Sequence, residues 1–145
     1  MLYSDFKKIC RKRPIITSKD IIVPTKERHV LRNQLGRWEK KGLIIQLKRG
    51  VYLLNEDDRS IHPSRFFIAN QLYNPSYVSL EYALNYYDLI PEKVVDVTSI
   101  TTKKTKVFEN AIGKFTYQHL QPRAFRGFRA VKDEAGFSFF MADPE

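Results

Sequence analysis

The residue types that most often carry catalysis or hold metals are few in this sequence, and their spacing suits neither task. No Cys-x-x-Cys pair, His-Glu-x-x-His motif or other metal-ligand spacing links Cys10, His29, His62 and His119. The six glycines are scattered and form no phosphate-binding loop. Nothing in the sequence favours a Ser/His/Asp triad, whose members are brought together by the fold and have no fixed spacing in sequence. The sequence therefore predicts no enzyme, no metal and no cofactor.

One short motif has the form of a nuclease signature. Glu39-Lys40-Lys41 is a Glu-x-Lys sequence, but it lies within a predicted helix and no strand-borne Asp precedes it. Solvated charge is the better interpretation. A nuclease remains the third alternative, and metal-dependent cleavage of plasmid DNA would reveal it.

The most distinctive chemical feature of the sequence is its positive charge, which is concentrated in the first third of the chain. The chain has 25 Lys or Arg against 16 Asp or Glu, a net charge of +9. Residues 1–55 hold 14 of the basic residues and four acids, a net charge of +10, whereas residues 56–145 carry −1. Such a basic block predicts a polyanionic partner, because each phosphate that Lys or Arg neutralises releases condensed counterions.

The aromatic residues are distributed the opposite way, which indicates two structural units. Fifteen of the 19 aromatics follow residue 55. We therefore expect one domain over residues 1–55 and a second over 60–145, with a polar joint between them. A single cysteine, no secretory signal and no run of about 18 apolar residues predict a cytoplasmic protein with no membrane association.

The order of elements predicted for the first unit is that of a winged helix-turn-helix. Ser4 is expected to cap a short helix that buries Phe6, Ile9 and Cys10 and ends before Pro14. A second short helix is predicted from Thr17 through residues 21–22. Thr25 is expected to cap a longer helix that ends near Gly42, and two strands then flank Arg49-Gly50 as a tight hairpin.

The longer helix is the predicted DNA-reading element. Leu31, Leu35 and Trp38 form its apolar stripe, so the opposite face and the hairpin tip are free to contact DNA. We expect Asn33 to pair with adenine and Arg32 or Arg37 with guanine, while lysines anchor phosphates. The predicted DNA-binding residues are Lys26, His29, Arg32, Asn33, Arg37, Lys40, Lys48 and Arg49. Two alternatives stay open: His29 is as easily a bystander, and a winged helix can instead dock a partner protein.

The second unit is predicted to be a small α+β domain, with two helices followed by a mostly antiparallel sheet. Pro63 is expected to open the first helix, and Ser79 to cap the second, after a loop over residues 73–77. Strands are predicted within residues 94–101, near 107–108, over 115–120 and around Phe128 and residues 137–140. Its aromatics fall at core spacings, so core packing is preferred over base stacking, and Lys103, Lys104 and Lys106 are read as a solvated loop.

Several segments in a fixed order resemble the AbiEi-type antitoxins, transcriptional regulators that are paired with nucleotidyltransferase toxins in phage defence. The matching segments are LGRWEKKGLI (35–44), LKRGVY (47–52), IANQLY (68–73), PSYVSLEYAL (75–84), LIPE (89–92) and VTSITT (97–102). The first two are general winged-helix sequence, and the later ones are more specific.

This resemblance implies an α+β chain whose N-terminal domain binds and represses its own promoter, with inverted repeats as the expected operator. It also implies a second domain that supports neutralisation of a toxin. Family members usually continue into further helices beyond residues 142–145, so the second domain is expected to be truncated relative to the family.

Overall fold

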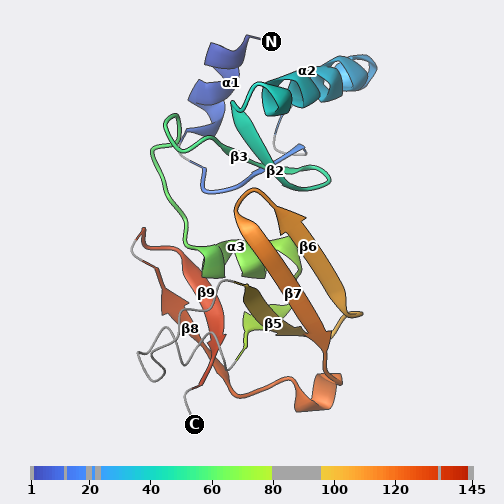
Figure 1. Cartoon of the computed structure of the whole chain (residues 1–145), viewed down its shortest axis with the longest axis vertical. Coiled ribbons are helices and arrows are strands. Elements are labelled where there is room, and N and C mark those ends of the chain that lie inside the picture. The colour runs from blue at the N-terminus through green and yellow to red at the C-terminus, as the bar shows by residue number, and fades with distance from the viewer. Residues whose placement is uncertain are drawn as a thin grey trace. The chain divides into compact units, whose positions relative to one another are not determined.

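A computed structural model of the chain describes residues 2–11, 13–18, 21, 24–79, 96–133 and 135–143. The chain divides into two units, residues 1–62 (unit 1) and 63–145 (unit 2), each with its own set of packed elements (Figure 1). The fold is α+β, as the sequence predicts.

Unit 1 has a winged-helix arrangement of helices and a three-stranded antiparallel sheet. In chain order its described elements are α1 (Tyr3–Cys10), β1 (Ile16–Thr17), the 3-10 turn η2 (Thr25–Glu27), α2 (Arg28–Lys40), β2 (Ile44–Lys48) and β3 (Val51–Leu54). The strand order is β1-β3-β2, so the β2–β3 hairpin forms the wing.

The core of unit 1 lies between α1, α2 and this sheet. Phe6 is fully buried, and its ring centroid lies 4.9 Å from that of Trp38 on α2. Tyr3 contacts the same indole edge-on at 5.4 Å. Leu31 and Leu35 are also buried, which confirms the apolar stripe predicted for α2. Packing of this stripe leaves the opposite face of α2 outside the core.

Three local predictions for unit 1 are wrong. Leu2, not Ser4, precedes α1, and no side chain caps that helix. Ile9 is 48% exposed, because the buried face of α1 runs through Phe6 and Cys10 toward Tyr3 instead. Thr25 does not cap α2, because residues 25–27 form a 3-10 turn and the α-helix begins at Arg28.

The second short helix predicted in unit 1 lies mostly outside the described residues. Thr17, its predicted first residue, ends strand β1 instead.

Helix α2 ends at Lys40, and Gly42 terminates it as the sequence predicts. Gly42 has a φ of 75°, and its N–H donates to the Glu39 carbonyl at 3.0 Å. The Leu43 N–H donates to the Trp38 carbonyl at 2.9 Å. This pair of bonds is the Schellman motif, which favours glycine because the left-handed conformation is strained for residues with a Cβ.

A small polar cluster ties α1 to the turn that follows β3. The Tyr3 hydroxyl donates to Asp58 Oδ2 at 2.7 Å, and Lys7 Nζ lies 3.1 Å from Asp58 Oδ1. The Asn55 side chain accepts from the Asp58 N–H at 2.8 Å. The hydrogen bond from Tyr3 and the ion pair with Lys7 hold the pKa of Asp58 below its usual value. Ionised Asp58 therefore stabilises the packing of α1.

Asp58→Asn is expected to lower the free energy of unfolding of unit 1 by about 1 kcal/mol at neutral pH, since a partly exposed, charge-assisted hydrogen bond is weakened. The lowered pKa means that this stabilisation is present above the ordinary Asp range and is lost as the pH falls through the folded-state pKa. Urea unfolding followed by Trp38 fluorescence measures the difference. It should shrink toward zero in acid, and a difference independent of pH would contradict the assignment.

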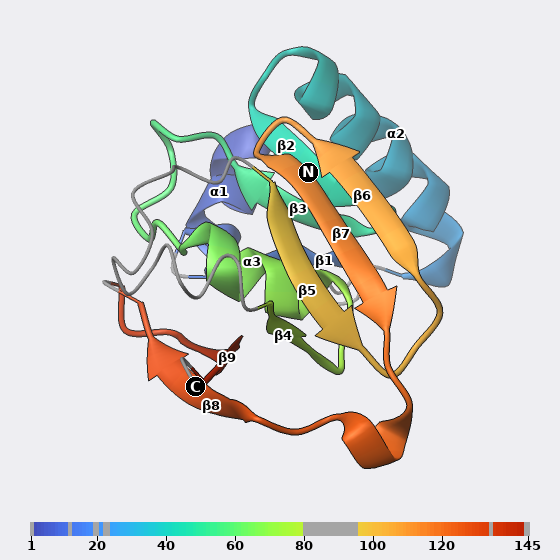
Figure 2. The same ribbon diagram turned by 60° about the horizontal axis from the view of Figure 1, so that its bottom comes forward.

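Unit 2 is built on a six-stranded mixed sheet. Its described elements are α3 (Arg65–Leu72), β4 (Ser76–Val78), β5 (Val97–Thr101), β6 (Lys106–Asn110), β7 (Gly113–His119), the 3-10 turn η3 (Pro122–Ala124), β8 (Phe128–Lys132) and β9 (Ser138–Ala142). The strand order is β6-β7-β5-β4-β9-β8. Three of the strand pairs are antiparallel, whereas β4–β9 and β5–β7 are parallel. Figure 2 shows β5, β7 and β6 side by side.

Helix α3 is fastened to this sheet by buried polar contacts as well as by apolar packing. Asn70 donates to the Phe140 carbonyl at 3.3 Å and accepts from the Phe140 N–H at 2.6 Å. One side chain therefore satisfies both backbone groups of this β9 residue. The Tyr117 hydroxyl donates to the Ala69 carbonyl. The Phe66 and Phe139 rings stack at 5.3 Å. These contacts bury most of α3.

Two expectations for unit 2 need correction and a third falls outside the described residues. Ser64, not Pro63, precedes α3, and its hydroxyl accepts from the Phe67 N–H at 3.1 Å. The last two residues of the loop predicted over 73–77 belong to strand β4, which lies between β5 and β9. The helix predicted to follow Ser79, through residue 87, falls outside the described residues.

Candidate nucleic-acid interface

The outer face of α2 presents a row of polar and basic side chains to solvent. At 100° per residue, the positions opposite Leu31, Leu35 and Trp38 are those the sequence assigned to DNA contact. The structure places all of these outer-face residues in the exposed class: Lys26, His29, Asn33, Arg37 and Lys40. Lys26 precedes the α-helix on the η2 turn, and Lys40 is the last helical residue. None of these side chains takes part in the core of unit 1.

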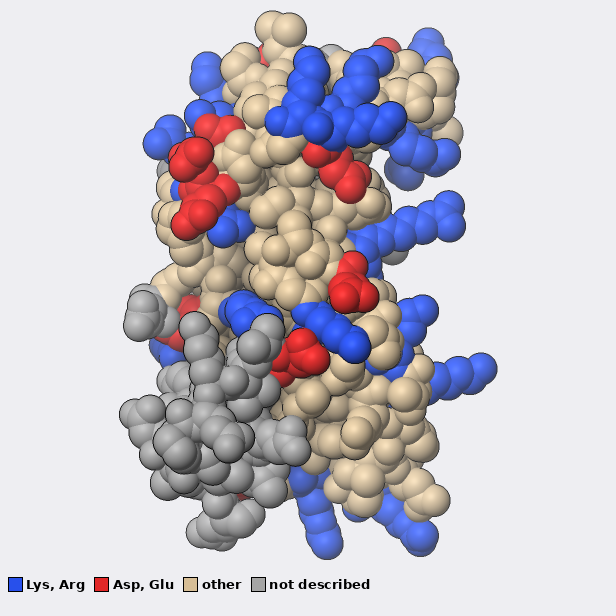
Figure 3. Space-filling model, in the orientation of Figure 1, with Lys and Arg blue, Asp and Glu red and all other residues tan. Residues whose placement is uncertain are grey.

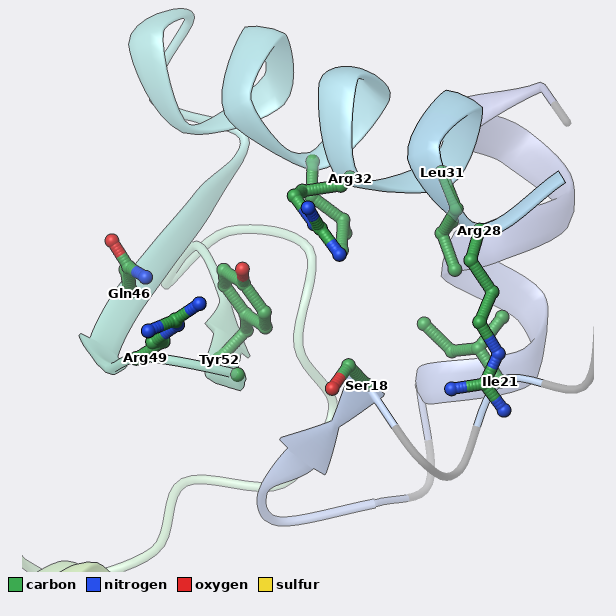
Figure 4. Close-up of a pocket in the computed structure, with 10 residues that line it drawn as sticks. Ser18, Ile21, Arg28, Leu31, Arg32, Gln46, Arg49 and Tyr52 are labelled. Atoms are coloured by element: carbon green, nitrogen blue, oxygen red, sulfur yellow. The ribbon is translucent and has the colours of Figure 1, made fainter. Parts of the chain in front are cut away.

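Two further basic residues of α2 are exposed and lie on the side of the helix that borders the hairpin. Arg28 and Arg32 are one helical turn apart, and both line a hollow of about 380 Å³ between α2 and the β2–β3 hairpin. Arg49 enters the same hollow from the hairpin tip (Figure 4). The structure therefore brings together two of the predicted residues, Arg32 and Arg49, from separate elements.

The walls of the hollow are rich in hydrogen-bond donors. Besides the three arginines it is lined by Ser18, Gln46 and the ring of Tyr52, and apolar residues of the core form its remaining wall. No Asp or Glu belongs to this described lining. Burial, and then the nearby Glu39 carboxylate, raise the pKa of Tyr52, whereas Arg32 acts in the opposite direction. The Tyr52 hydroxyl thus stays protonated and able to donate across the physiological range.

The hairpin tip that carries Arg49 is shaped by one glycine. Gly50 has a φ of 79°, and its carbonyl accepts from the Ser18 N–H at 2.9 Å. A Cβ on Gly50 would lie 3.3 Å from Ser18 Oγ, so a side chain is disfavoured by both conformation and space. The register shifts between Gln46 and Lys48. Lys48 is half-buried and Arg49 is exposed.

Sequence reasoning missed Arg28, Gln46 and Ser18 as members of this surface. Arg28 carried a usable signal, because it lies four residues before Arg32 and so shares its helix face. Gln46 lies two residues after Ile44, which is buried against α2, so strand alternation could have assigned it to the same side of β2. Ser18 could not have been found, since its position depends on the pairing of β1 with β3.

The outer face of α2, the lining of the hollow and the hairpin tip together form a basic surface, the helix–hairpin surface. Figure 3 shows Lys and Arg side chains gathered around the α2 end of this unit on the face in view. A helix and a hairpin that both present positive charge are the two elements with which a winged helix contacts a duplex. One comparison with known proteins bears on this surface.

Residues 10–55 match the family model of the AbiEi antitoxin transcriptional regulators. The matched segment runs from the end of α1 through α2 and the hairpin, so it contains every residue of the helix–hairpin surface. The resemblance to the AbiEi antitoxins is confirmed over this segment. The match supports a regulatory role that involves DNA in general, and the family is one of regulators rather than of enzymes. No curated protein matches the chain.

The aromatics of unit 2 are engaged with one another. Tyr77 stacks on Phe128 at 4.7 Å and contacts Phe125 at 5.1 Å. Lys103 lies over the Tyr73 ring at 5.1 Å, and Lys106 over Phe108 at 5.6 Å. These contacts favour the predicted packing of the rings within unit 2 over base stacking.

Across the described ranges, no three His, Cys, Asp or Glu side chains lie together as metal ligands. Every helix in the part of the chain that is described is too short or too polar to cross a membrane.

Proposed function

We propose that this chain is a sequence-specific repressor that inserts α2 into the major groove of duplex DNA and rests the β2–β3 hairpin on the neighbouring backbone. The observation that carries the proposal is the exposure of His29, Asn33 and Arg37 on one face of α2, with exposed Lys26 on the η2 turn before it and Arg49 at the hairpin tip. An α-helix is about 10–12 Å across, and the major groove is about 12 Å wide.

Within this arrangement the side chains divide into readers and anchors. Asn33 pairs with adenine and Arg37 with guanine, because both side chains can form two hydrogen bonds with the major-groove edge of one base. Lys26, Lys40 and Lys48 contact phosphates, which orients the protein without specifying sequence. His29 lies next to Asn33 on the exposed face and extends the contact.

The family match supports a further step, in which the operator is the promoter of the chain's own gene and the chain is the antitoxin of a nucleotidyltransferase toxin. Two copies on an inverted repeat would follow from the symmetry of such operators. A nucleotidyltransferase gene adjacent to this one is the expected genomic context. Repression of a reporter that carries the upstream region tests the regulatory step directly.

Selection of bound duplexes from a random pool tests sequence reading. The full chain is expected to enrich a defined motif, and Asn33→Ala or Arg37→Ala should relax the preference at about one or two base positions, at a loss of discrimination of about 1–3 kcal/mol each. Lys48→Ala should weaken all duplexes to a similar degree and leave the motif unchanged.

Lys8→Ala provides a matched control, since Lys8 is an exposed cation on α1 rather than on α2 or the hairpin. It should leave both motif and affinity nearly unchanged. Sequence preferences that survive both Asn33→Ala and Arg37→Ala would show that α2 is not the reading helix.

A further inference from the structure

Unit 2 carries a group of cations of its own, apart from the helix–hairpin surface of unit 1. These are exposed side chains from the β5–β6 turn, the start of β6 and the segment that follows β7. We call them the unit 2 basic surface, which comprises Lys103, Lys104, Lys106, Arg123 and Arg126. Figures 1 and 2 both place the β5–β6 turn and the short orange coil of η3 at the same end of the sheet.

Two hydrogen bonds hold these two segments together. The Leu120 N–H donates to the Thr101 carbonyl at 2.8 Å, just beyond the last register pair of β5 and β7. The His119 ring lies beside the turn, with its Nδ1 2.9 Å from the Lys103 carbonyl oxygen. The η3 turn begins at Pro122, so its arginine follows within a few residues of these contacts. Lysines and arginines that are distant in sequence therefore share one end of unit 2.

Aromatic rings hold two of the lysines in place. Lys103 Nζ lies 5.1 Å from the centroid of the Tyr73 ring, and Lys106 Nζ lies 5.6 Å from that of Phe108. These two rings contact each other edge-on at 5.9 Å. The Tyr73 hydroxyl also donates to the Lys104 carbonyl at 2.9 Å, which ties the turn to the end of α3. An ammonium group has three donors, and a ring occupies only one side of it, so donors remain for an anion.

The positive charge of this surface is not compensated by acids. Residues 101–106 and 119–126 contain five Lys or Arg and no Asp or Glu. Within the described ranges, none of these five cations forms an ion pair. Nearby acids are engaged elsewhere: Glu109 faces Lys114 across β6 and β7, Asp143 lies 3.8 Å from Arg129, and both carboxylate oxygens of Asp133 accept backbone N–H groups. Such a surface favours a polyanion.

The distribution of the cations indicates how a polyanion would be bound. They are exposed on three successive parts of the surface, so each can meet a different phosphate along a backbone. The neighbouring rings of Tyr73 and Phe108 are half-buried, carry a lysine and also contact Tyr117, so little ring surface is left for base stacking. Phosphate contact without base reading is the mode that fits.

We infer that the unit 2 basic surface is a second DNA-backbone contact, which binds phosphates of the duplex outside the base pairs that α2 reads. This inference rests on the proposed function, because α2 brings the duplex to the chain. Once one unit is bound, the other meets the same duplex at a high effective concentration, so even weak phosphate contacts add affinity. Because every base pair has the same phosphates, the added affinity is independent of the flanking sequence.

Extending the duplex tests the inference on the full chain. One duplex is trimmed to the selected motif, and the other extends it on both sides by about two helical turns of mixed sequence. The extended duplex should bind at least about tenfold more tightly. Its slope of log affinity against log salt should be steeper by about two or three, since two or three further phosphates are neutralised. Hydroxyl-radical cleavage should show protection in the flanks.

A triple variant assigns this gain to the unit 2 basic surface. Lys103→Gln, Lys104→Gln and Arg123→Gln together should abolish the gain and the flank protection, and should leave affinity for the trimmed duplex unchanged. All three side chains are exposed, so the substitutions remove charge without disturbing the core. Lys114→Gln is the matched control, because Lys114 is an exposed cation near the opposite end of β7 from His119. It should keep the full gain.

No gain from the flanks, or a gain that survives the triple variant, would overturn the inference. The proposed function would stand in either case, because it concerns the motif in the trimmed duplex. If selection enriches no motif, the proposed function fails, and a mixed-sequence duplex at low salt tests the unit 2 basic surface by itself. The triple variant should then bind several-fold more weakly than the Lys114→Gln variant, and equal affinities would overturn the inference.

Discussion

Raising the salt concentration from about 50 to about 200 mM is expected to weaken binding of the chain to duplex DNA by about a thousandfold. The helix–hairpin surface offers enough Lys and Arg to neutralise roughly six phosphates, and each neutralised phosphate releases close to one counterion. The contributing side chains are Lys26, Arg28, Arg32, Lys40, Lys48 and Arg49. Fluorescence anisotropy of a labelled duplex, measured over a salt series, gives the slope directly.

Single substitutions make this prediction specific to the surface. Arg49→Ala should reduce the slope of log affinity against log salt by about one, whereas Lys8→Ala on α1 should leave it unchanged. A salt slope near zero would contradict phosphate contact by this face. It would instead favour the alternative in which the winged helix docks a partner protein.

Phe6→Ala is expected to lower the free energy of unfolding of unit 1 by about 3–5 kcal/mol. Phe6 is fully buried against Trp38, so truncation leaves a cavity at the contact that positions α2. Small domains have only about 5–15 kcal/mol in total, so unit 1 would lose much of its stability and with it most DNA binding. Urea unfolding followed by fluorescence of Trp38, the only tryptophan, reports on unit 1 alone.

Ile9→Ala is the matched control, since it removes a large apolar side chain from the same helix. Ile9 is 48% exposed, so its loss should change the free energy of unfolding by no more than about 0.5 kcal/mol. Equal effects of the two substitutions would mean that the buried face of α1 is misassigned.

Helix α2 and the hairpin could be predicted from the sequence because their signals are local. Leu31, Leu35 and Trp38 recur at helical spacing, and that spacing alone assigns the opposite face to solvent. Gly42 and Gly50 stand where the backbone needs positive φ, so the helix end and the hairpin turn follow from residue type. The concentration of charge in the first third needs no structure at all.

The face of α1 could not be chosen correctly from the same kind of signal. Phe6, Ile9 and Cys10 satisfy helical spacing as well as Tyr3, Phe6 and Cys10 do. The choice depends on Trp38, 35 residues from Tyr3, and on Asp58, 55 residues away. In unit 2, Ser76 and Tyr77 are predicted as loop for a similar reason: β4 forms only because β5 pairs along it and β9 pairs with it at Val78.

By itself the amino-acid sequence determined which helix presents its charge outward, because a periodic apolar stripe fixes the buried side of a helix wherever that helix packs. Only the tertiary structure decided that Arg28, Arg32 and Arg49 line the same hollow. This arrangement depends on how the hairpin packs against α2, through the turn at Gly42 and the pairing of β1 with β3. Contacts between residues distant in sequence have no local signature, because they arise from the packing of whole elements.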